Sequence, residues 1–263
     1  AGVGFIFMAL WSVRKHEAQQ ALEVAHPEDP WLWKMEWQEG KIKSTGKAQF
    51  VLPAVMATFW NLISAPLIFF IPGEVLDNGN KLALIGLVFP IVGVGLAVWA
   101  IRAFARWKKL GDSVFEMRAV PGVIGGELAG RIVTSVDLEA TEGFHLTLSC
   151  INRVTTGSGK NRSTSERVLW QQEHHLLKEL LDWDPTRSEI PVLFAIPYDA
   201  TPTEKRSDDD EVLWRLELKA EVPGLDYAAR FEVPVFKTIA SQPDFALDEN
   251  SSRRLVTRER HWR

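Results

Sequence analysis

The sequence predicts a membrane protein of mixed class, in which two to three transmembrane α-helices are followed by an all-β sandwich domain. The first observation is that nearly all long apolar runs lie in residues 1–107. The second is that apolar and polar residues alternate after residue 110, which is typical of half-buried strands. The net charge of −4 and the single cysteine, Cys150, provide neither the basic patch expected for nucleic-acid binding nor a disulfide framework.

Two segments are long enough to cross a bilayer as helices, which requires about 20 apolar residues. Residues 48–73 contain no charged side chain, and residues 82–107 contain none before Arg102. Residues 1–13 are also apolar but too short. We therefore expect residues 1–13 to be the end of a further transmembrane helix, in a chain truncated upstream.

The distribution of lysine and arginine predicts the orientation, because cytoplasmic loops are enriched in both residues. Residues 14–47 contain six of them and four more lie at or just after the end of the last span, whereas residues 74–81 contain only one. We therefore expect an external hairpin at residues 74–81. The same rule places residues 14–47 and 108–263 in the cytoplasm.

Four tryptophans flank the predicted spans. Trp31, Trp33 and Trp37 lie among charges in the loop at residues 14–47, and Trp107 ends the last span. Indole rings favour the headgroup region of a bilayer, where one edge is wet and the other apolar. We therefore expect all four at the membrane interface, with the lipid bilayer as partner. An aromatic cage for a ligand is the alternative for the first three.

Strands are predicted where the alternation is strongest, at residues 113–120, 143–154, 211–222 and 225–236. One buried and one solvated face per strand indicates antiparallel sheets packed as a sandwich. We place this domain at residues 108–240. The faces expected to be buried carry Leu146, Leu148 and Cys150 in one strand, and Val212, Trp214, Leu216, Leu218 and Ala220 in another. Residues 174–183 are the exception and are predicted to form a short helix.

A proline-rich segment at residues 190–203 links the domain to a known type of sandwich. Pro191 and Pro197 are predicted to bracket a strand at residues 192–196, because proline suits strand ends and edges. Residues 189–236 resemble the arrestin-type sandwich, a relative of the immunoglobulin-like folds. The positions that carry this resemblance are Phe194, Ile196, Pro197, Pro202, Trp214 and Leu216.

Most of the chain also resembles a bacterial family of membrane proteins that is described only as a domain of unknown function. The shared segments are PWLWKMEW, FWNLISAP, LVFPIVGVGL and IPVLFAIP, in this order. The resemblance covers the C-terminal part of that family and implies an extracytoplasmic domain before Ala1. It also implies a bacterial inner (plasma) membrane as the location, and it implies no catalytic activity.

Two glycine-rich segments lack the patterns of nucleotide sites. Residues 155–164 fail the phosphate-loop pattern, because Val154 stands five residues before Gly159 and Asn161 follows Lys160. We interpret this segment as a polar hairpin loop. Residues 120–130 lack the Gly-x-Gly-x-x-Gly pattern and are interpreted as a turn or bulge between strands.

The candidate metal and catalytic residues are equally weak. His174 and His175 are adjacent and should diverge, and Glu179 adds only one helical pair with His175, so a solvated surface pair is favoured over zinc. Residues 208–210 are three aspartates without the EF-hand spacing and are interpreted as a solvated loop. No serine stands in a Gly-x-Ser-x-Gly motif. We therefore predict no catalytic residue, cofactor or metal.

The tail at residues 241–263 is basic and is predicted to dock on anionic headgroups or on a protein partner, with a disordered end as the alternative. Its arginines are Arg253, Arg254, Arg258, Arg260 and Arg263.

Together these features predict a non-enzymatic integral membrane protein, an accessory subunit or scaffold. Its cytoplasmic sandwich would serve protein–protein interaction or assembly, with another membrane or cytoplasmic protein or by self-association. The alternative is a component of a transporter or membrane enzyme, with a site completed by an upstream part or another subunit.

Overall fold

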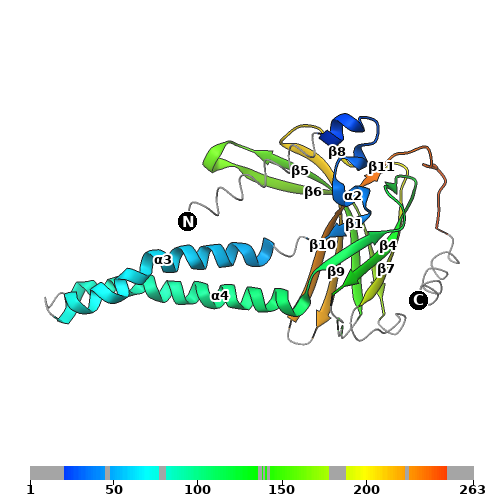
Figure 1. Cartoon of the computed structure of the whole chain (residues 1–263). Helices are drawn as coiled ribbons and strands as arrows, with labels where there is room; N and C mark the ends of the chain where they lie inside the picture. Colours follow the sequence, from blue (N-terminus) through cyan, green and yellow to red (C-terminus); the bar gives the residue numbers. More distant parts are fainter. Residues whose placement is uncertain are drawn as a thin grey trace. The chain divides into compact units, whose positions relative to one another are not determined.

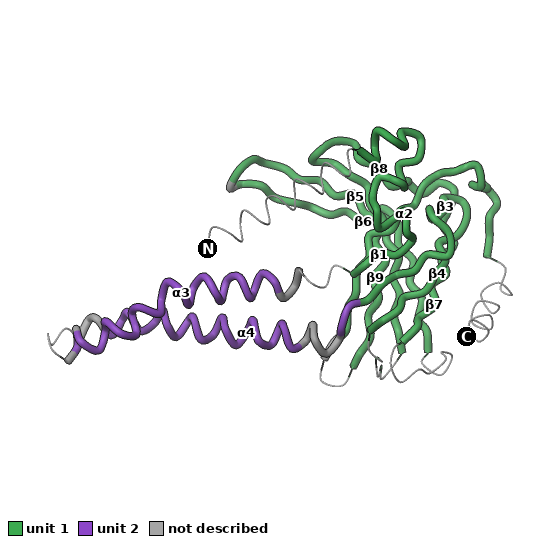
Figure 2. The backbone as a smooth tube through the Cα atoms, viewed as in Figure 1, with its two compact units in different colours: residues 1–44, 113–263 green, residues 45–112 purple. Residues whose placement is uncertain are grey.

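The computed structural model describes residues 21–44, 48–76, 81–135, 138, 140, 143–177, 188–222 and 225–247. The chain divides into two compact units that are interleaved in sequence (Figure 2). Residues 45–112 form a unit that we call the helical hairpin. The described residues before and after it form the β unit. The predicted membrane helix end at residues 1–13 and the arginines of the tail lie outside the described residues.

The helical hairpin contains two long helices that run side by side (Figure 1). Windows at Val51–Gly73 and Leu84–Ala105 are long and apolar enough to cross a membrane. Both windows fall inside the two segments that the sequence predicted as spans. The elements of this unit are α3 at Ala48–Leu76, η3 at Lys81–Leu87 and α4 at Val88–Leu110.

Polar groups join the two helices. The Nδ2 atom of Asn61 donates to the Ala57 carbonyl at 2.8 Å, within α3, and to the Gly93 carbonyl of α4 at 2.9 Å. The indole of Trp60 donates to the Phe89 carbonyl at 2.9 Å and stacks on the Phe89 ring. A Cβ atom on Gly93 would lie only 2.6 Å from Asn61 Oδ1. Glycine at this position therefore lets the helix backbones approach closely, as small residues do in membrane helix pairs.

The β unit is a sandwich of two antiparallel sheets. One sheet has four strands in the order β1-β2-β4-β7, and the other has five, in the order β10-β9-β5-β6 with β8 paired to β9. A short parallel pair joins β11 to β3. The strands are β1 at Lys41–Lys43, β2 at Ser113–Met117, β3 at Gly122–Val123, β4 at Gly126–Thr134, β5 at Phe144–Thr156, β6 at Ser163–Leu176, β7 at Glu189–Ile196, β8 at Glu204–Lys205, β9 at Asp210–Val222, β10 at Leu225–Val233 and β11 at Val235–Phe236. The short helices are η1 at Pro30–Leu32, α2 at Met35–Gln38 and η4 at Gly159–Asn161.

The core lies between the two sheets. Phe115 of β2 packs against Phe231 of β10, with ring centroids 6.1 Å apart, and His174 of β6 stacks on Phe194 of β7 at 4.4 Å. These contacts connect the inner strand β2 with the edge strand β10, and the two edge strands β6 and β7 with each other. The predicted faces of β5 and β9 are confirmed, since the residues expected inside are buried and the alternating charged residues of β9 are not.

The structure differs from the sequence prediction in where the β unit begins. Residues 14–47 were predicted as a loop before a sandwich at residues 108–240. Instead, β1 pairs antiparallel with β2, with Lys41 opposite Glu116, so residues 21–44 belong to the β unit. The sandwich therefore does not simply follow the helices in sequence. It takes strands from both sides of them.

Two smaller predictions also change. The strand predicted between Pro191 and Pro197 begins earlier, at Glu189, so Pro191 lies inside β7 opposite Arg131. Proline is tolerated there because β7 is an edge strand. The helix predicted at residues 174–183 is wrong at its start, since residues 174–176 are the end of β6 and pair with β5. Residues 178–187 lie outside the described residues.

Candidate functional site

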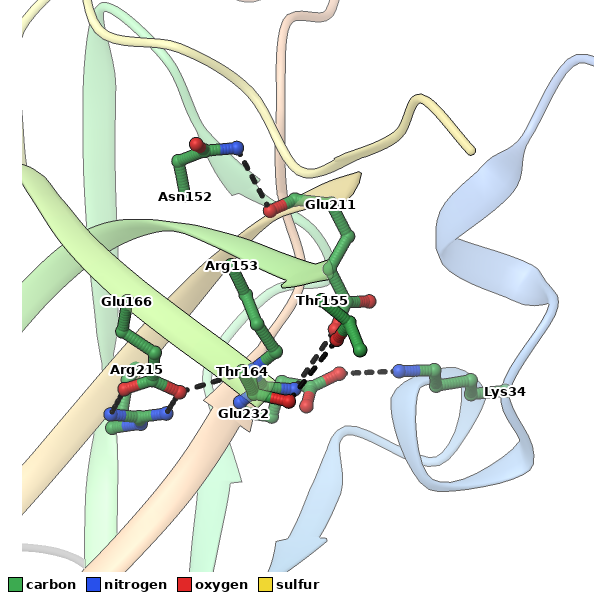
Figure 3. A network of polar contacts seen from close by, with 9 residues as sticks. All are labelled: Lys34, Asn152, Arg153, Thr155, Thr164, Glu166, Glu211, Arg215 and Glu232. Carbon is green, nitrogen blue, oxygen red and sulfur yellow. Dashed lines mark hydrogen bonds and ion pairs between the residues drawn. The ribbon is translucent and has the colours of Figure 1, made fainter. Parts of the chain in front are cut away.

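The most organised polar cluster of the β unit lies on the solvent-facing side of the five-stranded sheet (Figure 3). Arg153 of β5 donates to Glu166 of β6 at 3.0 Å and to Glu211 of β9 at 2.9 Å. Arg215 of β9 donates from both terminal nitrogens to Glu166, at 2.8 and 2.7 Å. These four residues, which we call the charge ladder, therefore link three strands. Asn152 adds a weaker bond to the Glu211 carbonyl at 3.4 Å.

Glu166 is the centre of the charge ladder. Hydrogen bonding from Arg215 lowers the pKa of Glu166 to about 2, with Arg153 acting in the same direction and partial burial opposing both. The same carboxylate raises the pKa of Arg215 through its hydrogen bonds. Both groups are therefore ionised over the whole physiological pH range, which suits a structural clamp and provides no proton donor or acceptor for catalysis.

A second cluster joins the segment before the helices to the end of the sandwich. We call residues 30–43 the N-terminal strap. Trp37 is 5% exposed and donates from Nε1 to the Glu232 carbonyl at 3.1 Å. Lys34 forms an ion pair with the Glu232 carboxylate and lies 4.1 Å above the Trp37 ring. The rings of Trp31 and Trp37 pack on Phe236 at 5.6 and 6.3 Å.

These contacts define the surroundings of the tryptophans predicted at the membrane interface. Trp37 is enclosed by the β unit, and the Trp33 indole donates to the His26 carbonyl at 2.8 Å. Trp31 and Trp33 are partly exposed. The side chain of Trp107 lies outside the described residues. Packing within the β unit thus accounts for the Trp37 ring, while an interfacial role for the other three stays a prediction.

The apolar residues of the proposed sandwich signature lie in the core of the β unit. Phe194, Ile196, Trp214 and Leu216 are all buried. The Trp214 indole donates to the Thr201 carbonyl at 2.9 Å, which ties the proline-rich turn to β9. Pro197 accepts a backbone bond from Ala200, and Pro202 follows Thr201 at the end of the same turn. These positions are structural, and the geometry gives none of them a reactive partner.

Comparisons with known proteins give little beyond this architecture. No family model and no curated protein matches the chain. Spo0M, a sporulation control protein from Bacillus subtilis, is similar over 48% of this chain and 49% of its own, with 11% identity and a TM-score of 0.32. CsgH from R. palustris is similar over 45% of this chain and 87% of its own, with 8% identity and a TM-score of 0.19. The chain thus spans about half the length of Spo0M. At such low TM-scores, the description as a β-sandwich rests on the strand order and the core.

The segments rejected as phosphate-loop and calcium sites are connections between strands, as expected, whereas most of the segment at residues 120–130 belongs to strands β3 and β4. Gly159–Asn161 forms a short 3-10 turn within the hairpin between β5 and β6. Asp208 pairs with Lys205 and Asp209 pairs with Arg162, in the loop between β8 and β9. The glycine-rich segment after residue 120 holds β3 and the turn into β4.

The sequence interpretation missed one histidine arrangement. His175 does diverge from His174, but it stacks on His145 of β5, with ring centroids 4.3 Å apart. His174 points into the core instead, where burial lowers its pKa although its hydrogen bond to the Leu193 backbone opposes the shift. Within the described residues, no group of three or more His, Cys, Asp or Glu side chains could hold a metal ion.

The remaining nucleophile is Cys150, which is buried in the core and whose Sγ donates to the Thr201 carbonyl at 3.5 Å. Burial raises the pKa of Cys150 to about 11. The thiol is therefore protonated at neutral pH and faces protein, which is unsuitable for nucleophilic attack.

The sequence did not predict the charge ladder or the N-terminal strap either, because the residues that contact each other there come from segments that are distant in sequence. Alternating charges along β9 were the only local signal.

Proposed function

We propose that this chain is an integral membrane protein in which the helical hairpin is the anchor and the β unit is an interaction module. The observation that supports the anchor is the surface of the two helices. Only 17% and 6% of the residues in the two apolar windows are buried. Large apolar side chains such as Phe69 and Phe70 are 81% and 70% exposed. Core helices of soluble proteins bury such side chains, whereas lipid solvates them.

The polar atoms of the hairpin fit the same proposal. A bilayer offers no hydrogen bonds, so polar groups inside it need partners within the protein. Asn61 and the Trp60 indole donate to backbone carbonyls between the helices, and Thr58 Oγ1 donates to the Ala54 carbonyl at 2.8 Å. No ionisable residue lies in residues 51–73 or 84–101. The pattern favours an anchor over a proton-coupled transport pathway, which usually contains such residues.

Membrane insertion can be tested by reconstituting the full chain into vesicles. We expect the protein to float with the vesicles and to resist extraction at alkaline pH. A variant with Leu62→Arg and Phe69→Arg should lose most of this association, because charges at helix centres insert poorly. Val168→Arg, at an exposed apolar position of the β unit, is the matched control and should float normally. Release of the wild-type chain by alkali would refute the anchor.

The β unit contains an open edge that suits a protein partner. β6 pairs with β5 along its length and ends the five-stranded sheet, so its other side offers backbone donors and acceptors. Val168 and Leu169 of β6 are 52% and 41% exposed. Exposed edges of this kind accept an additional strand from another chain. We therefore propose that a cytoplasmic protein, or another subunit in the membrane, binds along β6 of an arrestin-like sandwich.

Site-specific photo-crosslinking in intact cells can test this role. A crosslinker at Ser165 or Arg167 on β6 should capture a single partner in high yield. The same group at Lys219, which is exposed on the central strand β9, is the control. Equal capture at all three positions, or none at β6, would contradict strand addition at this edge.

A further inference from the structure

The helical hairpin is inserted into the connection between two paired strands. β1 ends at Lys43 and β2 begins at Ser113, and these strands lie side by side in one sheet. The amide of Ser44 donates to the Ser113 carbonyl at 2.9 Å, and the Met117 amide donates to the Gly40 carbonyl at 2.8 Å. The chain therefore leaves the β unit and returns to it at adjacent points, with residues 45–112 between them.

The N-terminal strap forms a second attachment. Lys34 and Trp37 both contact Glu232 of β10, and the Trp37 ring packs on Phe236 of β11. Ile42 of β1 is 2% exposed, so it is almost fully buried, as Trp37 is. Residues before the hairpin thus fill part of the core that residues after the hairpin build. The β unit is incomplete without both.

We propose that this arrangement couples folding of the β unit to insertion of both helices. The inference rests on the proposed membrane anchor. Strands on opposite sides of a bilayer cannot pair, so β1 can reach β2 only if the hairpin crosses the membrane an even number of times. In a chain with only one inserted helix, β2 would lack its partner strand β1, and Phe236 would lose the packing of the Trp37 ring. The β unit can therefore fold completely only in chains in which both helices have inserted.

The pairing of β1 with β2 can be trapped in the full-length protein. The pairs Ser44–Ser113 and Gly40–Met117 are joined by backbone hydrogen bonds. Hydrogen-bonded and non-hydrogen-bonded pairs alternate along an antiparallel ladder, so Lys41 and Glu116 form a non-hydrogen-bonded pair. Such pairs bring Cα atoms to about 4.5 Å, close enough for a disulfide. We expect Lys41→Cys with Glu116→Cys to form a disulfide in membranes under mild oxidation. Lys43→Cys with Glu116→Cys is offset by two residues and is the matched control.

A second set of variants changes how many times the chain crosses the membrane. A variant lacking Leu84–Ala105 retains one apolar helix, and its disulfide yield in the floated fraction should fall about tenfold or more. Replacing the same 22 residues by an unrelated leucine–alanine helix should restore the yield. Restoration would show that the crossing number matters rather than the packing of α3 on α4. Undiminished disulfide formation in floated chains with one helix, or no restoration by the new helix, would overturn the inference.

Side-specific labelling separates this inference from the proposed anchor. Glu39→Cys and Asp208→Cys each add one exposed thiol, besides the buried Cys150, to one of the two parts of the β unit, and an impermeant maleimide should reach both added thiols from the same side of the vesicle. Failure of the wild-type chain to float would refute the anchor itself. A floating chain whose two thiols label from opposite sides would leave the anchor intact and refute the coupling.

Discussion

The guanidinium of Arg215 on β9 donates to both carboxylate oxygens of Glu166 on β6, at 2.8 and 2.7 Å, across the intervening strand β5. Arg153 on β5 joins the same carboxylate at 3.0 Å. One side chain therefore fixes three neighbouring strands relative to one another. Bidentate pairs of this type are among the strongest side-chain hydrogen bonds in proteins.

The first prediction is that Glu166 stabilises the β unit in a pH-dependent way. Its pKa is about 2 in the folded protein, below the ordinary value of 4.5. A lowered pKa means that the stabilisation is complete above pH 4.5 and is lost as pH falls toward 2. Because Glu166 is partly exposed, solvent screening limits the expected contribution to about 1 kcal/mol. Chemical unfolding of wild type and Glu166→Gln should differ by this amount at pH 7 and converge near pH 2.

The matched control for this prediction is Glu173→Gln. Glu173 lies on the same strand and accepts a hydrogen bond from Gln171 at 2.7 Å rather than from an arginine. Its substitution should change the unfolding free energy little at either pH. A constant difference between wild type and Glu166→Gln from pH 7 to pH 2 would contradict the assigned role of the charge ladder.

The parts of the fold that the sequence predicted are those whose signal is local. The apolar runs of α3 and α4 and the alternation along β9 each lie within one continuous segment. β1 is different, because it has three residues and two of them are lysines. Its strand conformation is decided by pairing with β2, far along the chain. No local pattern contains that information.

The error at residues 174–176 has the same origin. The segment HHLLKELL has a helical pattern, but β5 provides a long partner that continues to Phe144 opposite Leu176. Tertiary pairing therefore overrides local propensity. The charge ladder could not be predicted either, since Glu166 and Arg215 become neighbours only after the register of three strands is set. Alternating charges indicate a solvated face without naming the partners.

The second prediction concerns Trp37 in the strap. Trp37→Phe removes the Nε1 bond to the Glu232 carbonyl and should cost about 1 kcal/mol of unfolding free energy. Trp37→Ala also removes buried ring surface and should cost about 3–5 kcal/mol. Met35→Ala is the control, because Met35 is exposed on the same short helix. Thermal unfolding in detergent would measure all three, and an effect of Trp37→Ala as small as that of Met35→Ala would exclude strap docking.

The third prediction uses two glycines of α4. A Cβ at Gly93 would lie 2.6 Å from Asn61 Oδ1 and 3.3 Å from Ser64 Oγ, whereas a Cβ at Gly95 has nothing within 4 Å. Gly93→Ala should therefore push α3 and α4 apart and weaken the Asn61 bond to the Gly93 carbonyl, a contact worth about 0.6 kcal/mol in membrane proteins. Gly95→Ala should be neutral or slightly stabilising. Thermal stability in detergent would compare the two, and equal effects would contradict close packing at Gly93.

The last prediction concerns alkaline stability and Tyr227. Tyr227 is buried and its hydroxyl is hydrogen-bonded to Ser113 Oγ, between β10 and β2. Burial raises the pKa of Tyr227 to about 12, although the bond to Ser113 opposes the shift. A raised pKa means that the protonated phenol stabilises the folded state fully below pH 10, the ordinary value, and that this contribution is lost between pH 10 and 12.

Tyr227→Phe cannot ionise, so its unfolding free energy relative to wild type should rise over that interval. Below pH 10 it should be lower than wild type by about 1 kcal/mol, because the Ser113 hydroxyl loses its partner. Parallel stability curves for the two proteins from pH 8 to pH 12 would show that the Tyr227 phenol is not enclosed by the sandwich.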